Sequence, residues 1–319
     1  MKNLSVSIKN LDWIDSIMKK KRENLLQAMN KGKAGYLFIL PYVLIFFTFT
    51  VLPVIISMVF SFTSFNILEW PKFVGFENYS RLFFSDSVFV TGVKNTIVFA
   101  VILGPGGFLL SLICAWFINE LSLPIIRSFV TLIFYAPSIS GNAYLIWSIF
   151  FSGDDYGYAN SLLTRLGIIT EPIQFFTNPD YMIWVIIIIS LWTSLGTGFL
   201  SMIAAFQGVD KTYFEAGAID GIRNRWQELW YITIPMLKPQ MIFSAVMSIT
   251  SAFNVGAVIT AICGYPTTDY VAHTIMNHLT DYGTTRFEMG YASAIAVVLF
   301  VLMISFNQFA KRFISSIGK

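Results

Sequence analysis

Residues 92–118 read GVKNTIVFAVILGPGGFLLSLICAWFI, and the only charged residue in this run is Lys94, near its start. About 20 apolar residues are enough for a helix to cross the hydrocarbon core of a bilayer. In water, such a run would have to be covered by other protein, whereas lipid can cover it directly. The stretch therefore predicts a membrane-spanning helix.

The same pattern recurs along the chain. Of the 319 residues, 55% are hydrophobic and 12% are charged, about half the charged share of a typical soluble domain. Six apolar stretches are long enough to span, at residues 35–63, 92–118, 126–151, 181–206, 238–263 and 289–310. The predicted fold class is an all-α integral membrane protein with about six transmembrane helices.

The distribution of basic residues orients these spans. With both termini in the cytoplasm, sixteen of the 21 Lys and Arg residues fall on the cytoplasmic side and five on the other. Cytoplasmic segments of membrane proteins carry such an excess, so we predict that both termini are cytoplasmic. The outer loops are then residues 65–90, 152–180 and 264–288, and His273 and His278 are expected to be interfacial residues of the last loop.

Residues 1–33 are predicted to form a separate cytoplasmic segment ahead of the six-span domain, residues 34–319. Leu4, Ile8 and Leu11 recur at helical spacing, and a basic cluster follows at residues 19–22. This pattern fits an amphipathic helix on the membrane surface. A partly ordered tail fits it equally well.

Helix-breaking residues interrupt most of the predicted spans. They favour a bundle whose helices bend and pack closely. They are Pro41 and Pro53, residues 104–107, Pro137 with Gly141, Gly196 with Gly198, and Gly256.

Several kinds of chemistry are missing from the sequence. It contains no G-x-x-x-x-G-K-[ST] loop, no H-E-x-x-H motif and no catalytic constellation. We therefore expect no enzyme activity, no metal and no cofactor in this chain. No charged residue lies in the middle of a predicted span, although proton relays and voltage sensors need such residues. This favours a path for an uncharged polar solute that is moved by energy supplied from elsewhere.

Asn142, Trp192 and Asn254 are the candidates for that path, because they are polar or aromatic residues within predicted spans. Sugar sites combine aromatic stacking with amide hydrogen bonds. As alternatives, the Trp would anchor the helix at the interface and each Asn would bond a neighbouring helix.

Residues 207–236 form the longest predicted cytoplasmic loop, which we call the coupling loop. Asp210 is a suitable N-cap for a first helix, and Gly221 can adopt the left-handed conformation that ends it. Asn224 can cap a second helix. We therefore predict a helix, a turn and a helix.

Each of these two helices carries a recognisable pattern. In the second, Trp226, Leu229, Trp230 and Ile234 recur as an apolar stripe. In the first, small residues at 216–218 follow Glu215, which would let the helix enter a groove on a partner that pairs with Glu215. A re-entry helix packed on the chain's own spans fits the pattern equally well.

Residues 215–221, EAGAIDG, followed by Ile234-Pro235 and Pro239, resemble the EAA loop of permeases of binding-protein-dependent ABC importers. The likeness is greatest to the sugar-transport type, which includes the maltose larger permease and the glycerol-phosphate permease. It extends to residues 35–38 with Pro41 and Pro53, residues 73–79, Leu82-Phe83, Asn95-Thr96 and residues 290–294. The chain departs from the family at Gly217 and Ile222, where Ala is usual, and at Tyr265, where a second Gly is usual.

The resemblance implies a type I ABC importer permease fold in a bacterial inner membrane. It also implies a second related permease, two ATPase subunits that bind ATP and Mg, and an extracytoplasmic solute-binding protein, with no nucleic acid. In the coupling loop, Glu215 would be the charged docking contact, and Ala216, Gly217 and Ala218 would allow close approach. Gly221 would set the turn, and Asp220 would hold the loop.

The solute implied by the resemblance is a sugar or oligosaccharide. A phosphorylated polyol or another small solute is the alternative within transport. The alternative outside transport is a membrane assembly protein with no solute path.

Overall fold

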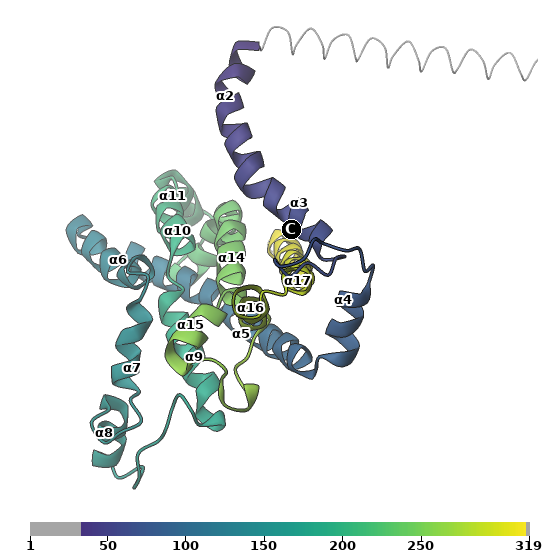
Figure 1. Cartoon of the computed structure of the whole chain (residues 1–319). Helices are drawn as coiled ribbons and strands as arrows, with labels where there is room; N and C mark the ends of the chain where they lie inside the picture. Colours follow the sequence, from purple (N-terminus) through teal and green to yellow (C-terminus); the bar gives the residue numbers. More distant parts are fainter. Residues whose placement is uncertain (1–32, 317–319) are drawn as a thin grey trace, which may run out of the picture. The chain divides into compact units, whose positions relative to one another are not determined.

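The computed structural model describes residues 33–316 (Figure 1). The segment 1–33 lies outside this range, except for Lys33, which begins the first described helix. The described residues are helical apart from turns and loops, and their only β-type pairing is an isolated bridge between Thr63 and Phe73. The predicted all-α class is confirmed.

The chain divides into two compact units, residues 1–57 and 58–319. The first unit is described from α2 (Lys33–Phe46) through a π-helical turn, η1 (Phe47–Val51), into α3 (Leu52–Phe60). Together, Gly35–Phe60 are 26 residues, long and apolar enough to span a membrane. The predicted span 35–63 ends earlier because the Ser61 and Thr63 hydroxyls bond the carbonyls of Met58 and Phe60 as the chain turns away.

The second unit holds the remaining helices. They are α4 (Glu77–Ser80), α5 (Ser87–Asn119), α6 (Pro124–Ile139), α7 (Ile146–Phe150), α8 (Tyr158–Arg165), α9 (Pro179–Thr193), α10 (Thr197–Gln207), α11 (Lys211–Ile219), α12 (Arg225–Glu228), α13 (Ile234–Met236), α14 (Lys238–Phe253), α15 (Gly256–Cys263), α16 (Ile275–Thr280) and α17 (Met289–Ser316). Short turns join them: the π-helical turns η2 (Arg81–Ser85), η4 (Leu229–Thr233) and η6 (Asp281–Thr285), and the 3₁₀ turns η3 (Ala143–Leu145) and η5 (Thr268–Tyr270).

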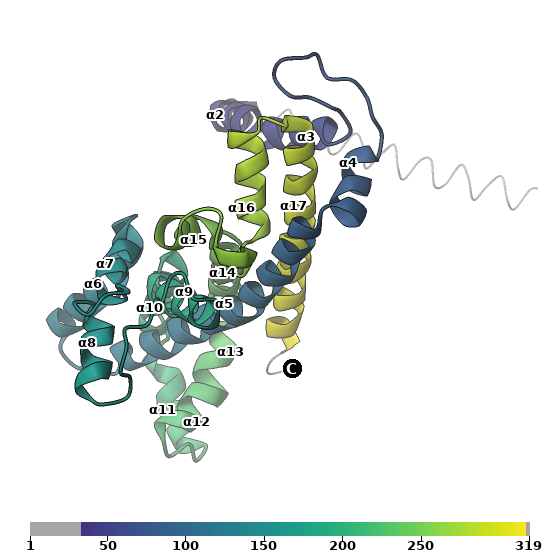
Figure 2. The same ribbon diagram turned by 60° about the horizontal axis from the view of Figure 1, so that its bottom comes forward.

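Two helices of this unit, α5 and α17, are each long and apolar enough to cross a membrane alone. Three further candidates are bent pairs: α6 with residues 143–150 at 90°, α9 with α10 at 45°, and residues 225–236 with α14 at 82°. Counting each pair as one span gives six in the described chain. In both views, α14 lies between α5 and α17, and it packs on both (Figure 2).

The predicted spans 126–151 and 238–263 are each interrupted, close to the helix-breaking residues that the sequence analysis names. The first breaks after Ile139, where Gly141 has a φ of +67° that is favourable only without a Cβ. The second breaks at Asn254 and Val255, and Gly256 then begins α15. At Gly256, an added Cβ would lie 2.9 Å from both Met276 Cβ and Thr274 Oγ1.

Residues 104–107 do not break α5, which runs through them from Ser87 to Asn119. Their glycines serve close packing instead. A Cβ on Gly104 would lie 3.2 Å from Ile249 Cγ1, and one on Gly107 would lie 3.1 Å from Ser194 Oγ. These glycines therefore let neighbouring helices pack closely and do not bend or break α5.

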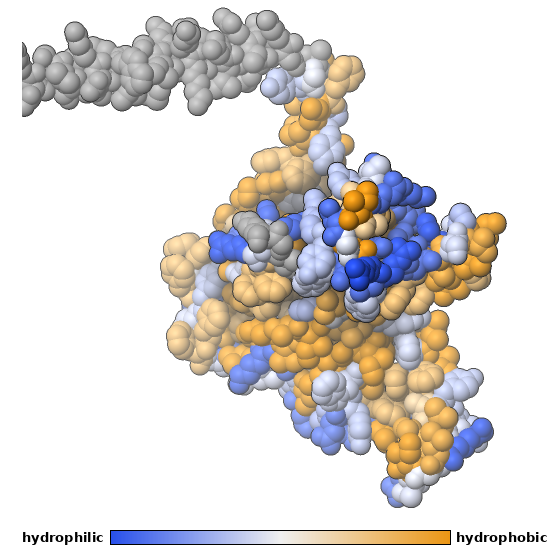
Figure 3. Space-filling view, turned by 180° about the vertical axis from the view of Figure 1, so that it is seen from behind, coloured by the Kyte–Doolittle hydropathy of each residue, from blue (hydrophilic) through white to orange (hydrophobic). Residues whose placement is uncertain are grey.

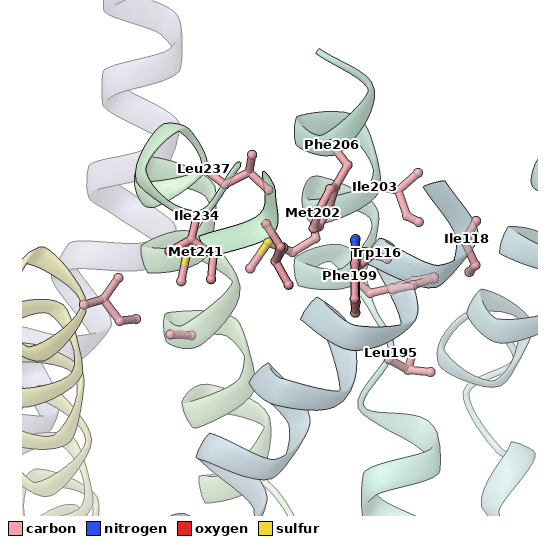
Figure 4. Close-up of a cluster of buried hydrophobic side chains, with 14 residues drawn as sticks. Trp116, Ile118, Leu195, Phe199, Met202, Ile203, Phe206, Ile234, Leu237 and Met241 are labelled. Carbon is pink, nitrogen blue, oxygen red and sulfur yellow. The ribbon is translucent and has the colours of Figure 1, made fainter. Parts of the chain in front are cut away.

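The largest buried cluster joins α5, α10 and the start of α14 (Figure 4). Trp116 of α5 meets Phe199 and Met202 of α10 there, with Ile234 and Met241 completing the cluster. Outside the clusters, apolar side chains cover a broad band of the face shown in Figure 3. Such exposed apolar surface suits a protein that lipid surrounds.

Candidate functional site

The coupling loop has the predicted helix, turn and helix. Asp210 caps α11, since its Oδ1 accepts the Thr212 N–H at 3.0 Å, and this bond holds the pKa of Asp210 below its usual value. Gly221 ends the first helix at a φ of +93°. Asn224 caps α12, since its Oδ1 accepts the Gln227 N–H at 2.8 Å. In Figure 2, α11 and α12 lie at the end of the second unit opposite α16.

The predicted docking residues divide between two faces of α11. Glu215, Ala216 and Ala218 are exposed, as are Asp220 and Gly221 beyond the helix. Glu215 forms no ion pair or hydrogen bond with any other described residue.

Gly217 is buried on the opposite face. A Cβ there would lie 2.6 Å from Ile232 Cδ1 and 3.1 Å from Ile222 Cδ1. The close approach that Gly217 allows in this structure is therefore within the chain, between α11 and the following segment.

The predicted apolar stripe of the second helix holds only in part. Leu229 and Ile234 are buried, whereas Trp226 and Trp230 are 69% and 62% exposed. The π-helical turn Leu229–Thr233 adds a residue to one turn of the helix, so the 3.6-residue period that predicted the stripe does not continue through it.

A groove of about 720 Å³ separates the coupling loop from the turn between α5 and α6. Glu215, Lys211 and Arg225 line one side, and Glu120 and Arg127 line the other. Arg127 donates to the carbonyls of Asn119 and Leu121 at 3.1 and 2.8 Å, which satisfies the end of α5.

Two adjoining cavities of about 440 and 260 Å³ lie where the bent helices break. We call them together the hydroxyl cavity. They share Thr193 and Ser194 from the end of α9, and Ser248 and Ser251 from α14. The other polar lining residues are Tyr135, Ser138, Tyr144, Ser190, Thr197, Thr250 and Asn254. No charged side chain is among the described residues that line it.

Four of these ten hydroxyls, those of Ser138, Thr193, Ser194 and Thr250, already donate to carbonyls of their own helices. Ser194 Oγ donates to the Leu191 carbonyl at 2.7 Å, and Thr250 Oγ1 donates to the Val246 carbonyl at 2.8 Å. A hydroxyl oxygen can still accept hydrogen bonds while its proton is used in this way. Ser190 Oγ is buried without a partner. The lining therefore offers uncharged donors and acceptors, which suit a solute that is rich in hydroxyl groups.

Of the three predicted path residues, only Asn254 lines the hydroxyl cavity. Asn142 lies outside the lining and accepts the Tyr144 hydroxyl at 3.0 Å. Trp192 also lies outside it and packs edge-on against Trp147, with 5.5 Å between ring centroids. The sequence prediction missed the Ser and Thr residues. Their signal was spacing, since Ser190, Thr193, Ser194 and Thr197 fall three or four residues apart beside Gly196 and Gly198.

The prediction that His273 and His278 are interfacial is wrong, because both are buried, with 0% and 3% of their surface exposed. His278 Nε2 lies 3.0 Å from Asp86 Oδ2, and His278 Nδ1 lies 3.1 Å from His273 Nε2. Tyr291 donates its hydroxyl to the same Asp86 oxygen at 2.8 Å. This chain of contacts ties the loop before α17 to the start of α5, 192 residues away from His278 in sequence.

The electrostatics of this cluster keep Asp86 charged and the histidines neutral. Burial alone would raise the pKa of Asp86, but bonds from the Phe89 N–H and the Tyr291 hydroxyl hold that pKa below its usual value. Burial, reinforced by His278, lowers the pKa of His273 to about 4. Burial also lowers the pKa of His278, against the opposing charge of Asp86.

The chain is similar in sequence to known proteins. Residues 107–319 match the family model described as binding-protein-dependent transport system inner membrane component. The chain is 31% identical to the Probable ABC transporter permease protein YesP of Bacillus subtilis (strain 168), over 88% of this chain and 92% of that protein. It is 34% identical to the lactose transport system permease protein LacF of Rhizobium radiobacter, over 67% of this chain and 70% of that one.

The fold also matches a solved structure. This is a bacterial alginate ABC transporter in complex with an alginate pentasaccharide-bound periplasmic protein. The TM-score is 0.73 at 22% identity, over 89% of this chain and 94% of the matched one. The family match covers well over half of the sequence and includes the whole coupling loop and the hydroxyl cavity from Ser138 onward. The chain therefore belongs to the multi-pass inner-membrane permeases of binding-protein-dependent ABC transport systems.

Proposed function

We propose that this permease imports an uncharged sugar or oligosaccharide by alternating access. The hydroxyl cavity is the observation that carries the proposal. It lies at the breaks of the spans, and its described lining holds hydroxyls and one amide but no charged group. Hydroxyl and amide groups in such a lining can form hydrogen bonds with a sugar. These bonds replace the ones that the sugar made to water.

The same lining argues against a phosphorylated polyol. A phosphate group entering a low-dielectric cavity needs a cation or strong donors to replace its hydration. Lys, Arg and His are absent from the described lining. The sugar permeases among the relatives agree with the proposed solute class.

The energy for transport comes, on this proposal, from two ATPase subunits that bind ATP and Mg and dock on the coupling loop. Glu215 supports this role because it is exposed and lacks a partner within the described chain. Ala216 and Ala218 beside it are small and exposed, so a partner groove can approach the helix. Asp220 and Gly221 shape the turn, and residues 207–236 face the cytoplasm.

The complete machine would contain this chain, a second related permease, the ATPase pair and an extracytoplasmic solute-binding protein. The companion permease would supply the opposite wall of the solute path. Closure of the ATPase dimer would push α11 and shift the populations of the inward-open and outward-open states.

The test is to reconstitute the complex in lipid vesicles and to measure ATP hydrolysis and uptake for Glu215→Lys. We expect the variant to lose binding-protein-dependent hydrolysis by at least about tenfold, because a buried charge pair at the interface becomes a repulsion. Glu171→Lys is the matched control, since Glu171 is also exposed but lies in a predicted outer loop.

Solute class is tested in the same vesicles by comparing neutral oligosaccharides with uronates and polyol phosphates. Uptake of neutral sugars alone supports the proposal. If the complex takes up charged solutes instead, the proposal that the solute is an uncharged sugar is wrong. If no ATPase binds the chain, and uptake is the same with and without it, the assembly-protein alternative is favoured.

A further inference from the structure

One aromatic contact and one ion pair join α12 to the end of α5. The rings of Trp116 and Trp226 meet edge to face, with 4.7 Å between centroids. Arg225 Nε lies 3.4 Å from Glu120 Oε2. On either side of these contacts, the groove of about 720 Å³ keeps the coupling loop away from the turn between α5 and α6. We call the four residues the α5–α12 joint.

The two tryptophans differ in their surroundings. Trp116 is 8% exposed and belongs to the buried cluster with Phe199 and Met202. Trp226 is 69% exposed, so most of its ring contributes nothing to the core. A large aromatic side chain held at the surface against one buried ring is a local attachment between two elements rather than a part of general packing.

The same helix that carries Trp116 also packs against two serines that line the hydroxyl cavity. A Cβ on Gly107 would lie 3.1 Å from Ser194 Oγ and 3.5 Å from Ser248 Oγ, and both serines line the hydroxyl cavity. Gly107 and Trp116 are nine residues apart, about 14 Å along a helix. The only proline in α5, Pro105, precedes both, so the segment between them is uninterrupted helix.

We propose that the α5–α12 joint transmits motion of the coupling loop to the wall of the hydroxyl cavity. Trp116, Glu120, Arg225 and Trp226 are then positioning residues that make α12 and the Gly107–Asn119 part of α5 move as one body. A shift of this segment changes the contact of Gly107 with Ser194 and Ser248, because Gly107 approaches both so closely that a Cβ there would lie within 3.5 Å of their hydroxyls. This inference rests on the proposed docking of an ATPase on α11.

A competing route runs through the core. Leu229 and Ile234 are buried against α10 and α14, so the coupling loop also holds those helices. If that route carries all of the motion, the joint is dispensable. Single substitutions on the exposed side of the joint distinguish the two routes without opening a cavity in the core.

The primary experiment compares Trp226→Ala with Trp230→Ala in the reconstituted complex, measuring solute taken up per ATP hydrolysed. Trp230 is a matched control, since it is 62% exposed, one helical turn away, and makes no ring contact with another described residue. We expect Trp226→Ala to keep ATPase assembly and hydrolysis while uptake per ATP falls about threefold to tenfold, as an aromatic pair predicts. Trp230→Ala should keep the ratio of the unmodified chain.

Charge reversal and cross-linking test the geometry directly. Glu120→Arg should lower uptake per ATP, because the new guanidinium would face Arg225, whereas Glu120→Asp should lower it less. With Cys114 and Cys263 replaced by Ala, a short bifunctional thiol reagent joining Glu120→Cys to Arg225→Cys should leave uptake intact, because the two sides move together.

Three results would each contradict the proposed role of the α5–α12 joint. The first is an unchanged uptake per ATP in Trp226→Ala, and the second is an equal loss of uptake per ATP in Trp230→Ala. The third is that the cross-link stops uptake. These outcomes are separable from failure of the proposed function. If the proposed function itself is wrong, the unmodified complex shows no binding-protein-dependent ATP hydrolysis, and Glu215→Lys causes no further loss of it.

Discussion

At the scale of single residues, the buried histidines impose a direction on their hydrogen bonds. Asp86 accepts from His278 Nε2, so His278 Nδ1 must accept from His273 Nε2. His273 Nδ1 is then an acceptor, and it is buried without a partner. A proton on His278 Nδ1 has to break this order, whereas a proton on His273 Nδ1 leaves both hydrogen bonds in place.

The pH dependence of stability follows from the same cluster. In the unfolded chain His273 has the usual pKa near 6.5, and in the folded protein it is about 4. Between these values the unfolded state binds a proton that the folded state does not. Stability should therefore be constant above pH 6.5 and fall toward pH 4, by at most about 1.4 kcal/mol per pH unit for this group.

The measurement is the thermal unfolding temperature in detergent at pH 7.5, 5.5 and 4.5, for the unmodified chain and His273→Gln. The acidic loss should be smaller in the variant, although His278 still titrates. Asp86 does not produce the effect, because its carboxylate is lost only below its usual value of 3.8. Parallel curves for the two proteins would show that His273 does not cause the loss.

Burial of the histidines was not predictable from the sequence. Their partner Asp86 begins another helix, and nothing local marks the contact. The caps of the coupling loop were predictable, since Asp210 and Asn224 each bond an N–H within three residues. Local chemistry is visible in a single sequence, whereas partners far along the chain are not.

At the scale of elements, two of the four described π-helical turns, η1 and η4, occur in the same relation to proline. Phe47–Val51 is followed two residues later by Pro53, and Leu229–Thr233 is followed two residues later by Pro235. Proline has no N–H to donate to the carbonyl four residues back. A wider turn ahead of the proline rearranges those bonds. After Pro53 the helix then continues to Phe60, whereas after Pro235 it ends at Met236, before the 82° bend into α14.

The bend after α6 depends on Gly141 in a way that can be measured. Its φ of +67° is costly for Ala but tolerated by Asn, and a Cβ there would meet no atom within 4 Å. Gly141→Ala should therefore destabilise the protein by about 1 kcal/mol, and Gly141→Asn by less. Thermal unfolding of both variants provides the comparison. Equal losses would show that the positive φ of Gly141 does not set the cost.

Convergence of the Ser and Thr residues depends on these bends. Hydroxyl residues in helices usually bond their own backbone, so the spacing of Ser190, Thr193, Ser194 and Thr197 does not by itself indicate a function. Only after α6, α9 and α14 break do Ser138, Thr193 and Ser251 lie around one cavity. The sequence predicted spans and breakers, but not the cavity that the breaks create.

At the scale of the whole molecule, the orientation in the membrane is still a prediction from charge. It can be tested with an impermeant maleimide on spheroplasts, in a chain whose Cys114 and Cys263 are replaced by Ala. Thr268→Cys, exposed in the loop before α16, should react in intact spheroplasts. Arg223→Cys, exposed in the coupling loop, should react only after permeabilisation. Labelling in the opposite order would place both termini outside.

The broken helices have a consequence for how such a permease changes its solute during evolution. Thr193 and Ser194 lie at the end of α9, and Thr197 and Gly198 begin α10, so main-chain groups at helix ends border the cavity. Terminal carbonyls and N–H groups lack partners within their own helix. Mutation cannot delete main-chain groups. Affinity for polyhydroxyl compounds can therefore persist through genetic drift, while replacements of the surrounding side chains adjust which compound is preferred.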